Sequence, residues 1–198
     1  MERADWNERY AGAELVWTAQ PNRFLVAEAE ALPPGRALDL ACGEGRNAVW
    51  LAERGWRATG VDFSDVALAK GERLAAARGV EVEWVEADVR AWQPEPGAFD
   101  LVAVFYLQLP EHERRPVHRR AAAALAPGGT LLVVAHHATN PAEGYGGPQD
   151  PAVLFTEDDV VADVPGLEIV RAERVRRPVA TNDGEAVALD VLVRAERP

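Results

Sequence analysis

Three aspartates, Asp39, Asp62 and Asp88, lie at or near the ends of successive apolar runs in the first half of the chain. The runs have the length and composition of parallel strands, which helices cover on both faces. Because ligands bind beyond the carboxyl ends of parallel strands, we expect the three carboxylates to meet at one site. An acidic site of this kind favours a ligand with a positive charge or with hydroxyl and amine donors.

A glycine turn at residues 43–45 follows the first apolar run and leads directly into a predicted helix over 47–54. Gly43 and Gly45 allow a tight turn and a close approach of the backbone to a ligand, with the helix N-terminus pointing at the turn. The spacing Gly43-x-Gly45-x-x-Ala48 also satisfies the dinucleotide fingerprint, which places a pyrophosphate there. Glu44 would repel a pyrophosphate, so we expect a zwitterionic or cationic ligand instead.

Two of the aspartates suit an adenosine group. Asp62 ends the predicted second strand, Trp56–Val61, where an acid can accept hydrogen bonds from both ribose hydroxyls. Asp88 and the backbone amide of Val89 follow the predicted third strand, Val82–Val85, and are placed to meet the edge of an adenine. Three acidic strand ends are a more specific signal than the glycines alone.

The order of these motifs resembles that of the class I S-adenosylmethionine-dependent methyltransferases. The resemblance covers about residues 35–137 and rests on five segments: Leu38–Gly45, Val61–Ser64, Glu86–Asp88, Phe99–Val102 and Leu125–Gly129. Within that superfamily, the glycine turn followed by Arg46-Asn47 is most similar to the small tellurite-resistance and thiopurine type. That type has been credited with histidine and arginine participants near its C-terminal end, but no histidine follows His137 in this chain.

The resemblance implies S-adenosylmethionine as cofactor and S-adenosylhomocysteine as product. Carried over by position, Asp39 and residues 43–45 hold the methionine part, Asp62 the ribose, Phe63 and Val89 the adenine faces, and Asp88 the exocyclic amine. The full cofactor set that it implies is Asp39, Ala41, Gly43, Gly45, Asn47, Asp62, Phe63, Ser64, Ala87, Asp88, Val89 and Phe105.

Composition limits the classes of function. With 198 residues and 48% hydrophobic content, the chain is expected to be one domain. A net charge of −11 opposes binding to nucleic acid. Because no apolar run is long enough for a signal peptide or a membrane span, we expect a cytoplasmic protein without a membrane partner. A monomer or homodimer is expected. The single cysteine, Cys42, excludes an internal disulfide, and no metal site is expected.

Residues 1–32 precede the first strand and are predicted to be helical in two pieces, separated near Gln20-Pro21-Asn22. Trp6, Tyr10, Ala13 and Trp17 recur every three to four residues and form an aromatic stripe. Two interpretations remain open: the stripe packs on the domain, or the segment is a lid that brings Trp17 to a small substrate pocket. Related methyltransferases fold this segment over the cofactor.

The remaining pattern completes an α/β fold. The cofactor-binding core is predicted over 35–137, and 138–198 supplies a substrate rim and two final strands, Leu167–Pro178 and Glu185–Ala195. Asn182-Asp183-Gly184 between them favours a hairpin. The sequence therefore predicts a Rossmann-like, mostly parallel sheet of seven strands with an antiparallel C-terminal hairpin and helices on both faces. Arg114, Arg115 and His118, on a predicted helix over 111–125, are expected to be solvated.

Tyr106 follows the predicted fourth strand and is expected to border the transferred methyl group. His136-His137 end the fifth strand, and one of the two is expected to face the same pocket. The two histidines point to opposite faces of their strand and cannot easily share a metal ion. We select Tyr106 and His137 as candidate catalytic residues, either to orient an acceptor or to act as a base. Trp17, Tyr106, His137 and Tyr145 form the candidate substrate-binding set, in which Tyr145 lies on a glycine-rich rim loop over 140–151.

The expected reaction is transfer of a methyl group to a small-molecule acceptor by in-line displacement, in which the protein mainly positions the reactants. A thiol or chalcogen acceptor needs no strong base, whereas an oxygen or nitrogen acceptor does. Two alternatives remain: an NAD-dependent oxidoreductase, which keeps the glycine fingerprint, and a non-catalytic protein that binds S-adenosylmethionine.

Overall fold

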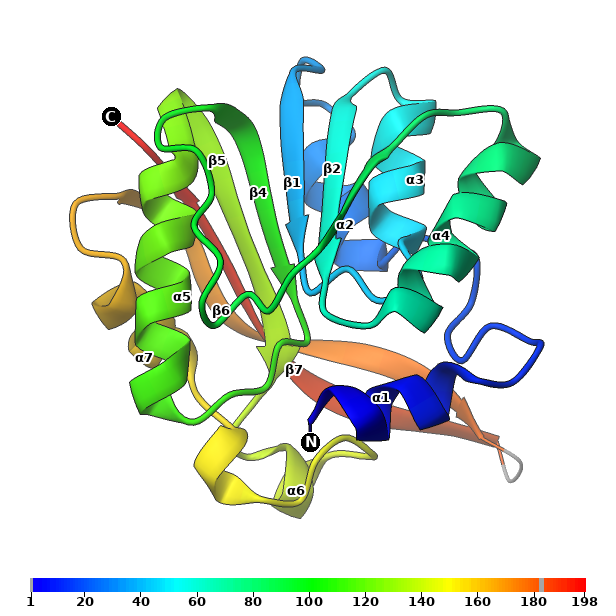
Figure 1. The fold of residues 1–198 in the computed structure, drawn as a ribbon. Coiled ribbons are helices and arrows are strands. Elements are labelled where there is room, and N and C mark those ends of the chain that lie inside the picture. The colour runs from blue at the N-terminus through cyan, green and yellow to red at the C-terminus, as the bar shows by residue number, and fades with distance from the viewer. Residues whose placement is uncertain (1, 182–183) are drawn as a thin grey trace.

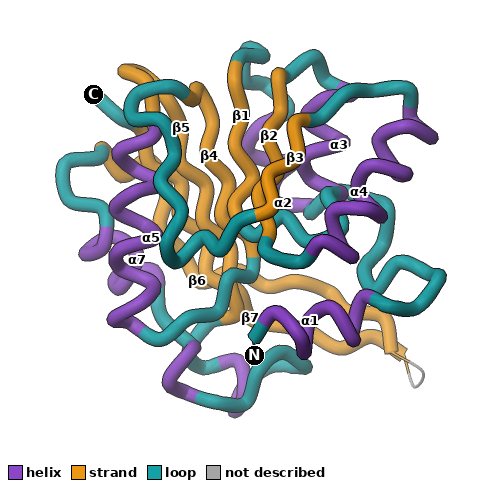
Figure 2. Tube along the Cα trace, viewed as in Figure 1, coloured by secondary structure: helices purple, strands orange, loops and turns teal. Residues whose placement is uncertain are grey.

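The computed structural model describes residues 2–181 and 184–198. Seven strands form one sheet in the order β3-β2-β1-β4-β5-β7-β6, with helices on both sides (Figure 1 and Figure 2). The strands are β1 Arg36–Leu40, β2 Arg57–Asp62, β3 Glu83–Glu86, β4 Phe99–Phe105, β5 Leu125–His136, β6 Glu168–Thr181 and β7 Gly184–Glu196. The helices are α1 Arg3–Tyr10, α2 Arg23–Ala29, α3 Arg46–Glu53, α4 Asp65–Arg78, α5 Glu111–Ala124, α6 Asn140–Glu143 and α7 Glu157–Asp163, with a short 3₁₀ turn at Pro151–Val153.

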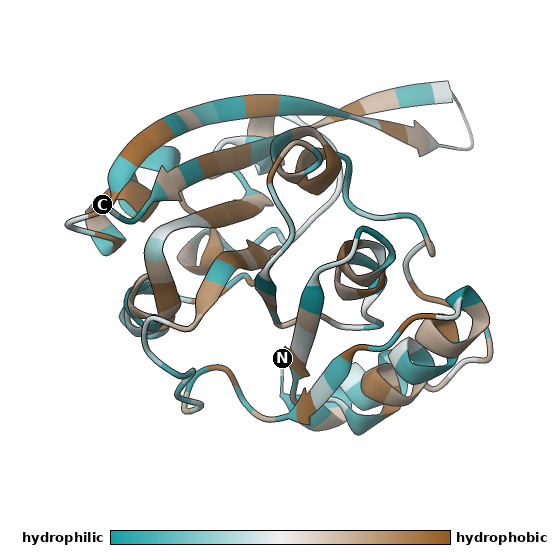
Figure 3. Cartoon of the chain, turned by 90° about the horizontal axis from the view of Figure 1, so that it is seen from above, coloured by the Kyte–Doolittle hydropathy of each residue, from teal (hydrophilic) through white to brown (hydrophobic). Residues whose placement is uncertain are grey.

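The strand pairing confirms the predicted fold class. Strands β1 to β5 pair in parallel, whereas β7 runs antiparallel to both β5 and β6. The sheet reverses its order between β1 and β4, the type of position where open α/β sheets bind ligands. The predicted Asn182-Asp183 turn lies outside the described residues. The long ribbon of β6 and β7 curves along one edge of the molecule, with hydrophilic and hydrophobic segments alternating along it (Figure 3).

The core has one layer on each face of the sheet. On one face, Leu38, Val102 and Val133 pack towards α5 and α7. On the other face, Ala37 and Leu132 lie with residues of α2 and α3. Because side chains alternate along a strand, neighbouring residues of β1 and β5 serve opposite layers. This alternation also decides which of two adjacent polar residues reaches the ligand edge.

The N-terminal segment contains less helix than the sequence predicts. Helix α1 ends at Tyr10 and α2 begins at Arg23, and residues 11–22 between them form turns and irregular backbone. Trp6 and Tyr10 stack with ring centroids 5.5 Å apart, but Trp17 lies outside any helix. Helix α1 contacts α4 and lies beside the carboxyl ends of the strands (Figure 1). No helix among the described residues is both long and apolar enough to cross a membrane.

Candidate functional site

Asp62 organises the turn after β1. Its carboxylate accepts hydrogen bonds from the backbone N–H of Gly43 at 2.8 Å and from that of Ser64 at 2.9 Å, one on each oxygen. Each oxygen of Asp62 therefore keeps a free lone pair. Burial raises the pKa of this carboxyl group. The Ser64 hydroxyl caps α4 by accepting from Ala67 N and donates to Asn7 of α1 at 2.6 Å. Asp62 thus fixes the glycine turn and still offers two acceptor positions.

Asp39 lies in β1 beneath the start of α3 and is only 2% exposed. Its Oδ2 atom has no hydrogen-bond partner among the described residues. Burial raises the pKa of this carboxyl group to about 7, and nearby Arg46 partly opposes the rise. A buried carboxylate oxygen without a donor is unfavourable, and the ammonium of an amino-acid group would supply one. This orphaned atom fits the methionine part of S-adenosylmethionine.

The two turn glycines are needed for contacts within the protein as well as for the turn. Both have positive φ, 55° at Gly43 and 73° at Gly45. A Cβ at Gly43 would lie 3.0 Å from the Tyr10 hydroxyl, and one at Gly45 would clash with the indole ring of Trp84. Trp84 of β3 therefore lies directly under the turn, while Tyr10 of α1 covers it from the other side. Neither contact was predicted from the sequence.

Glu44 does not face the ligand position, and the expectation that its charge selects the ligand is wrong. Its carboxylate is 3% exposed and accepts hydrogen bonds from Val16 N and Trp17 N, each at 3.0 Å. It also pairs with Lys70 of α4 at 3.0 Å. Because Lys70 neutralises the charge, Glu44 no longer argues against a pyrophosphate. The expectation of a positively charged group in the ligand therefore depends on Asp39.

A cavity of about 210 Å³ lies at the carboxyl ends of β2 and β3. Its lining includes Phe63, Ala87 and Asp88 of the expected adenine site, together with Glu2 and Arg3 of the N-terminal segment. The remaining lining residues are Glu86 and Arg90.

Asp88 is less free than expected. It accepts hydrogen bonds from Arg90 N and Arg90 Nε, and this pairing lowers the pKa of the Asp88 carboxyl group. Val89 instead packs in the core, and Arg120 donates to its carbonyl oxygen at 2.9 Å.

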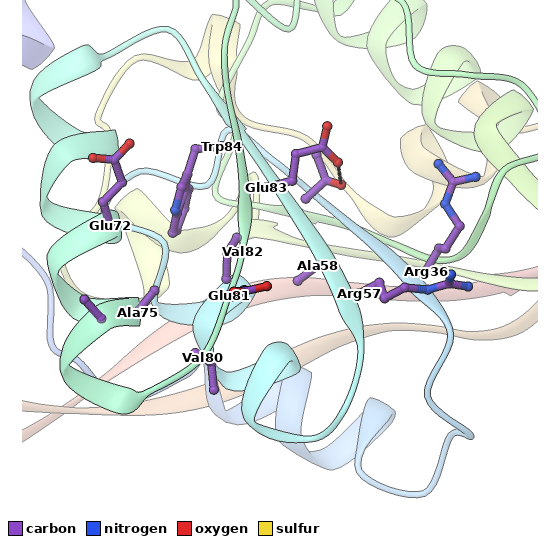
Figure 4. A pocket seen from close by; sticks show the side chains of 12 residues that line it. Arg36, Arg57, Ala58, Glu72, Ala75, Val80, Glu81, Val82, Glu83 and Trp84 are labelled. Carbon is purple, nitrogen blue, oxygen red and sulfur yellow. Dashed lines mark hydrogen bonds between the residues drawn. The ribbon is translucent and has the colours of Figure 1, made fainter.

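A larger cavity, of about 650 Å³, lies at the other end of the same strands (Figure 4). Arg36 and Arg57, which begin β1 and β2, line it together with Glu72, Glu81 and Trp84. Its position at the amino ends of the strands, and its charges of both signs, do not match the site defined by the three aspartates. Binding at the carboxyl edge is the general rule for such sheets, so we assign the site to the smaller cavity and the adjoining turn.

Backbone strain marks the carboxyl ends of β1 and β4. Among the described residues other than glycine, positive φ is found at Ala41, 57°, and at Tyr106, 56°. Both belong to the expected site, and strained backbone of this type concentrates at functional sites. Tyr106 belongs to a polar cluster whose other members come from β5, β6 and β7.

Four residues form that cluster: Tyr106, His136, Arg177 and Asp190. The Tyr106 hydroxyl donates to Asp190 at 2.8 Å, and Arg177 Nε donates to the same oxygen at 2.6 Å. His136 lies with its ring centroid 5.0 Å from that of Tyr106 and its Nδ1 atom 3.4 Å from Asp190. Burial raises the pKa of Tyr106 and lowers the pKa of His136, so both are neutral near pH 7. Asp190 is completely buried.

Arg46, the first residue of α3, is near both Asp39 and the cluster around Tyr106. Its guanidinium is within electrostatic range of Asp39, Tyr106 and Arg177, and burial lowers its pKa. Among the described residues, Arg46 interacts with these groups through charge at a distance and not through a side-chain hydrogen bond. In the sequence, Arg46 stood out only as part of a resemblance, although an arginine in the first turn of a helix, where acidic side chains are favoured, was a usable signal.

The other expected site residues lie elsewhere. His137 points to the opposite face of β5, where its Nδ1 accepts from Thr139 N and its Nε2 lies 3.3 Å from Glu157. Trp17 and Tyr145 are exposed on the surface. Asn47 accepts a hydrogen bond from Asn22 N and so joins α3 to α2, and Phe105 packs in the core.

A second buried polar cluster lies between α5 and α7, and it overturns one expectation. Arg114 and His118 are buried, and both bind Asp163, at 2.8 and 3.0 Å. The prediction that they are solvated is therefore wrong, because α7 covers the face of α5 that the sequence left open. The described residues contain no group of three or more His, Cys, Asp or Glu side chains arranged to hold a metal ion.

Comparisons with known proteins agree with this geometry. Residues 37–129 match the family model described as a methyltransferase domain. The chain is 37% identical over 129 residues to the demethylmenaquinone methyltransferase of Thermus thermophilus, covering 62% of this chain and 55% of that protein. It is 27% identical to thiocyanate methyltransferase 1 of Arabidopsis thaliana, covering 93% of this chain and 82% of the other. The chain spans about half the length of several other curated relatives.

Among solved structures, the N-methyltransferase NodS from Bradyrhizobium japonicum, in complex with S-adenosylhomocysteine, superposes with a TM-score of 0.75. The two chains are 18% identical, and the alignment covers 99% of this chain and 98% of NodS, so this likeness concerns the fold. The sheet order and the family match agree on the class. Residues 37–129 form a methyltransferase domain, and the chain is similar to the class I S-adenosylmethionine-dependent methyltransferases, a family whose cofactor is S-adenosylmethionine.

Proposed function

We propose that this chain transfers the methyl group of S-adenosylmethionine to a small anionic acceptor by direct displacement. The observation that carries the proposal is the convergence of Arg46 and Arg177 on Tyr106, next to the orphaned carboxylate of Asp39. Arg177 is paired with Asp190, so Arg46 supplies the positive charge that favours an anion where the acceptor must enter. The name of the thiocyanate methyltransferase relative, whose acceptor is an anion, supports this choice.

The cofactor-binding residues divide by position. Asp39 receives the ammonium of the methionine part, and the turn at residues 43–45 lies against it. Asp62 keeps one lone pair on each oxygen for the ribose hydroxyls. The cavity beside Phe63 and Ala87 takes the adenine, whose amine meets the acceptor positions of Asp88 that Arg90 leaves free.

When bound, the cofactor supplies a methyl group that its sulfonium makes electrophilic. The chain's own residues hold the acceptor in line with that methyl group. Arg177 is fixed by its hydrogen bond to Asp190. The Tyr106 hydroxyl donates its proton in a hydrogen bond to Asp190, so a lone pair of the Tyr106 oxygen can accept a hydrogen bond from a protonated acceptor. Positioning of two reactants supplies on the order of 7 to 11 kcal/mol of the barrier reduction. An anionic acceptor loses its charge as the new bond forms, so no general base is required.

His136 replaces His137 as the histidine proposed to border the acceptor. It lies on the same face as Tyr106, and its neutral imidazole can donate or accept a hydrogen bond. The N-terminal residues 1–32 are proposed as the lid and 138–198 as the rim of the acceptor pocket. Glu2 and Arg3 line the adenine cavity, which supports the first of these assignments.

The test combines binding with turnover. Calorimetric titration with S-adenosylhomocysteine should show binding to the purified chain. Acceptor candidates are then screened by release of S-adenosylhomocysteine: thiocyanate, iodide, small thiols, chalcogen oxyanions, carboxylates and phenols. We expect turnover with one or more anions. Binding without turnover on any of them supports a non-catalytic binding protein, and tight NADH binding without binding of S-adenosylhomocysteine supports an oxidoreductase.

A further inference from the structure

The side chain of Glu44 connects three separate segments of the chain. It belongs to the glycine turn, it accepts hydrogen bonds from Val16 N and Trp17 N, and it pairs with Lys70 of α4. The Lys70 ammonium also donates to the backbone carbonyl of Glu14 at 2.6 Å. The stretch over 14–17 is therefore attached to the turn and to α4 at the same point.

This attachment is buried and charged. The side chains of Glu44 and Lys70 are 3% and 4% exposed, so the pair is removed from water. A buried ion pair is costly unless each member is fully hydrogen-bonded. Part of that hydrogen bonding comes from the backbone over 14–17, so the pair is satisfied only while this stretch lies against the turn.

The neighbours of Glu44 explain how this attachment reaches the ligand. Glu44 lies between Gly43 and Gly45, whose turn is held by Asp62, the proposed ribose acceptor. Trp17, at the end of the attached stretch, also donates a hydrogen bond of 3.4 Å from its indole nitrogen to the hydroxyl of Tyr10, which covers the turn. A ligand that restrains the turn must also restrain this cover, and the reverse effect has the same size by thermodynamic linkage.

We infer that Glu44 and Lys70 are positioning residues that couple cofactor binding at the glycine turn to closure of residues 11–21. Closed, the cover buries the Lys70 ammonium; open, it exposes that ammonium to water. The pair acts through the turn and does not touch the reacting atoms. The inference rests on the proposed function, because the ligand at the turn is taken to be S-adenosylmethionine or its product.

The chain provides its own reporter, because Lys70 is its only lysine. Acetylation by a water-soluble amine reagent, followed by peptide mass spectrometry, compares Lys70 in the folded chain with Lys70 in the same chain unfolded in urea. We expect Lys70 to react at least about tenfold more slowly in the folded chain, and saturating S-adenosylhomocysteine to slow it by a further fivefold or more, a typical size for coupling between sites. Glu44→Gln should increase the acetylation rate and remove most of the ligand effect.

A matched control is Glu53→Gln. Glu53 pairs with Arg78 at 3.1 Å, so this variant also breaks an ion pair between α3 and α4, but on the surface and away from the turn. It should leave both the rate of Lys70 acetylation and the ligand effect unchanged.

The double variant Glu44→Gln/Lys70→Met separates coupling from simple stability. Each single change leaves one buried charge unpaired, whereas the double change removes both charges. Since it lacks lysine, it is followed by hydrogen exchange of the amides over 11–21, compared with and without S-adenosylhomocysteine. We expect a folded protein that binds the ligand about tenfold more weakly, with little ligand-dependent protection of those amides.

The outcomes divide as follows. If S-adenosylhomocysteine binds the unchanged chain without slowing the acetylation of Lys70, the coupling is absent and the inference fails while the proposed function stands. Full ligand-dependent protection in the double variant also overturns it. If S-adenosylhomocysteine does not bind at all, the proposed function fails and this inference fails with it.

Discussion

Two buried aspartates, one in each half of the ligand edge, differ in what surrounds them. Asp39 in β1 is 2% exposed and keeps one oxygen without a partner among the described residues, and burial raises its pKa to about 7. Asp190 in β7 is completely buried, but Tyr106 and Arg177 donate to it. The protein itself compensates the charge of Asp190, whereas one oxygen of Asp39 has no donor among the described residues and Arg46 acts on this carboxylate only at a distance. The missing partner, more than burial itself, identifies the position that a ligand completes.

The two halves of the ligand edge are held in place in different ways. The cofactor half, which contains Asp39, the turn at residues 43–45 and Asp62, is held by short connections between the ends of neighbouring strands, such as the hydrogen bonds from Gly43 N and Ser64 N to Asp62. The acceptor half is held by contacts between strands far apart in the chain, since Tyr106 and Asp190 are 84 residues apart. We therefore expect substitutions at Asp190 to act mainly on stability, and substitutions in the cofactor half to act mainly on binding.

The largest expected effect follows from Asp190→Asn. The change leaves Arg177 without its carboxylate and weakens the acceptor for the Tyr106 hydroxyl, so the free energy of unfolding should fall by about 3 kcal/mol. Urea unfolding measures this loss, and Glu185→Gln, at an exposed position on the same strand, should change it by less than about 0.5 kcal/mol. An unchanged free energy of unfolding would show that Asp190 is not the support of this half.

Asp62→Ala should have the next largest effect, on cofactor affinity. It removes both proposed ribose acceptors and the bonds that hold Gly43 N and Ser64 N. Loss of hydrogen bonds to a charged group costs about 1.5 to 3 kcal/mol, so the Kd for S-adenosylhomocysteine should rise about 100-fold. Calorimetry measures it, with Asp158→Asn, at an exposed position of α7, as the control. Equal affinity in Asp62→Ala and the unchanged chain contradicts the assignment.

Arg46→Gln tests whether the acceptor is an anion. Loss of one guanidinium near the acceptor should raise the KM for an anion such as thiocyanate about tenfold, with a smaller change for a neutral thiol. Arg46→Lys should recover part of the loss because it keeps the charge. Arg54→Gln, at the exposed C-terminal end of the same helix, should have no effect. A parallel rise in KM for charged and neutral acceptors argues against an anionic acceptor.

The residues proposed for the cofactor half could be grouped from the sequence because their signals are local. Asp39, Gly43, Gly45 and Asp62 belong to two strand ends within 24 residues, and the turn between them has a recognisable glycine pattern. Where a neighbour came from elsewhere in the chain, the prediction failed. Glu44 was assigned to the ligand because Lys70 and the stretch over 14–17 cannot be placed beside it without the fold.

The acceptor half was predicted only in part, for the same reason. Tyr106 follows from its place after β4, but its partners Arg177 and Asp190 depend on the register between β5, β7 and β6. One signal was available: Asp190 interrupts an otherwise apolar run from Ala186 to Val193. Strand parity also distinguished the histidines, because His136 shares a face with buried Val134, while His137 belongs to the opposite face.

The smallest expected effect concerns the pH dependence of cofactor binding through Asp39. Since its pKa in the folded chain is about 7, the carboxyl group is mostly protonated at pH 6, and an ammonium binds it only after the proton leaves. The affinity for S-adenosylhomocysteine should therefore rise about eightfold from pH 6 to 7.5 and level off above that, with proton release on binding. Calorimetry in buffers of different ionisation enthalpy measures both quantities.

The same shift has a defined sign for stability without ligand. The folded chain keeps a proton on Asp39 that the unfolded chain loses near pH 4, so Asp39 lowers the free energy of unfolding as the pH rises from about 4 to 7. Asp39→Asn removes this titration, so it should flatten the pH dependence of binding and weaken affinity at pH 7.5 more than at pH 6. If the variant keeps the slope of the unchanged chain, another group titrates, and Asp39 is no longer distinguished from Asp190 by its need for a cation.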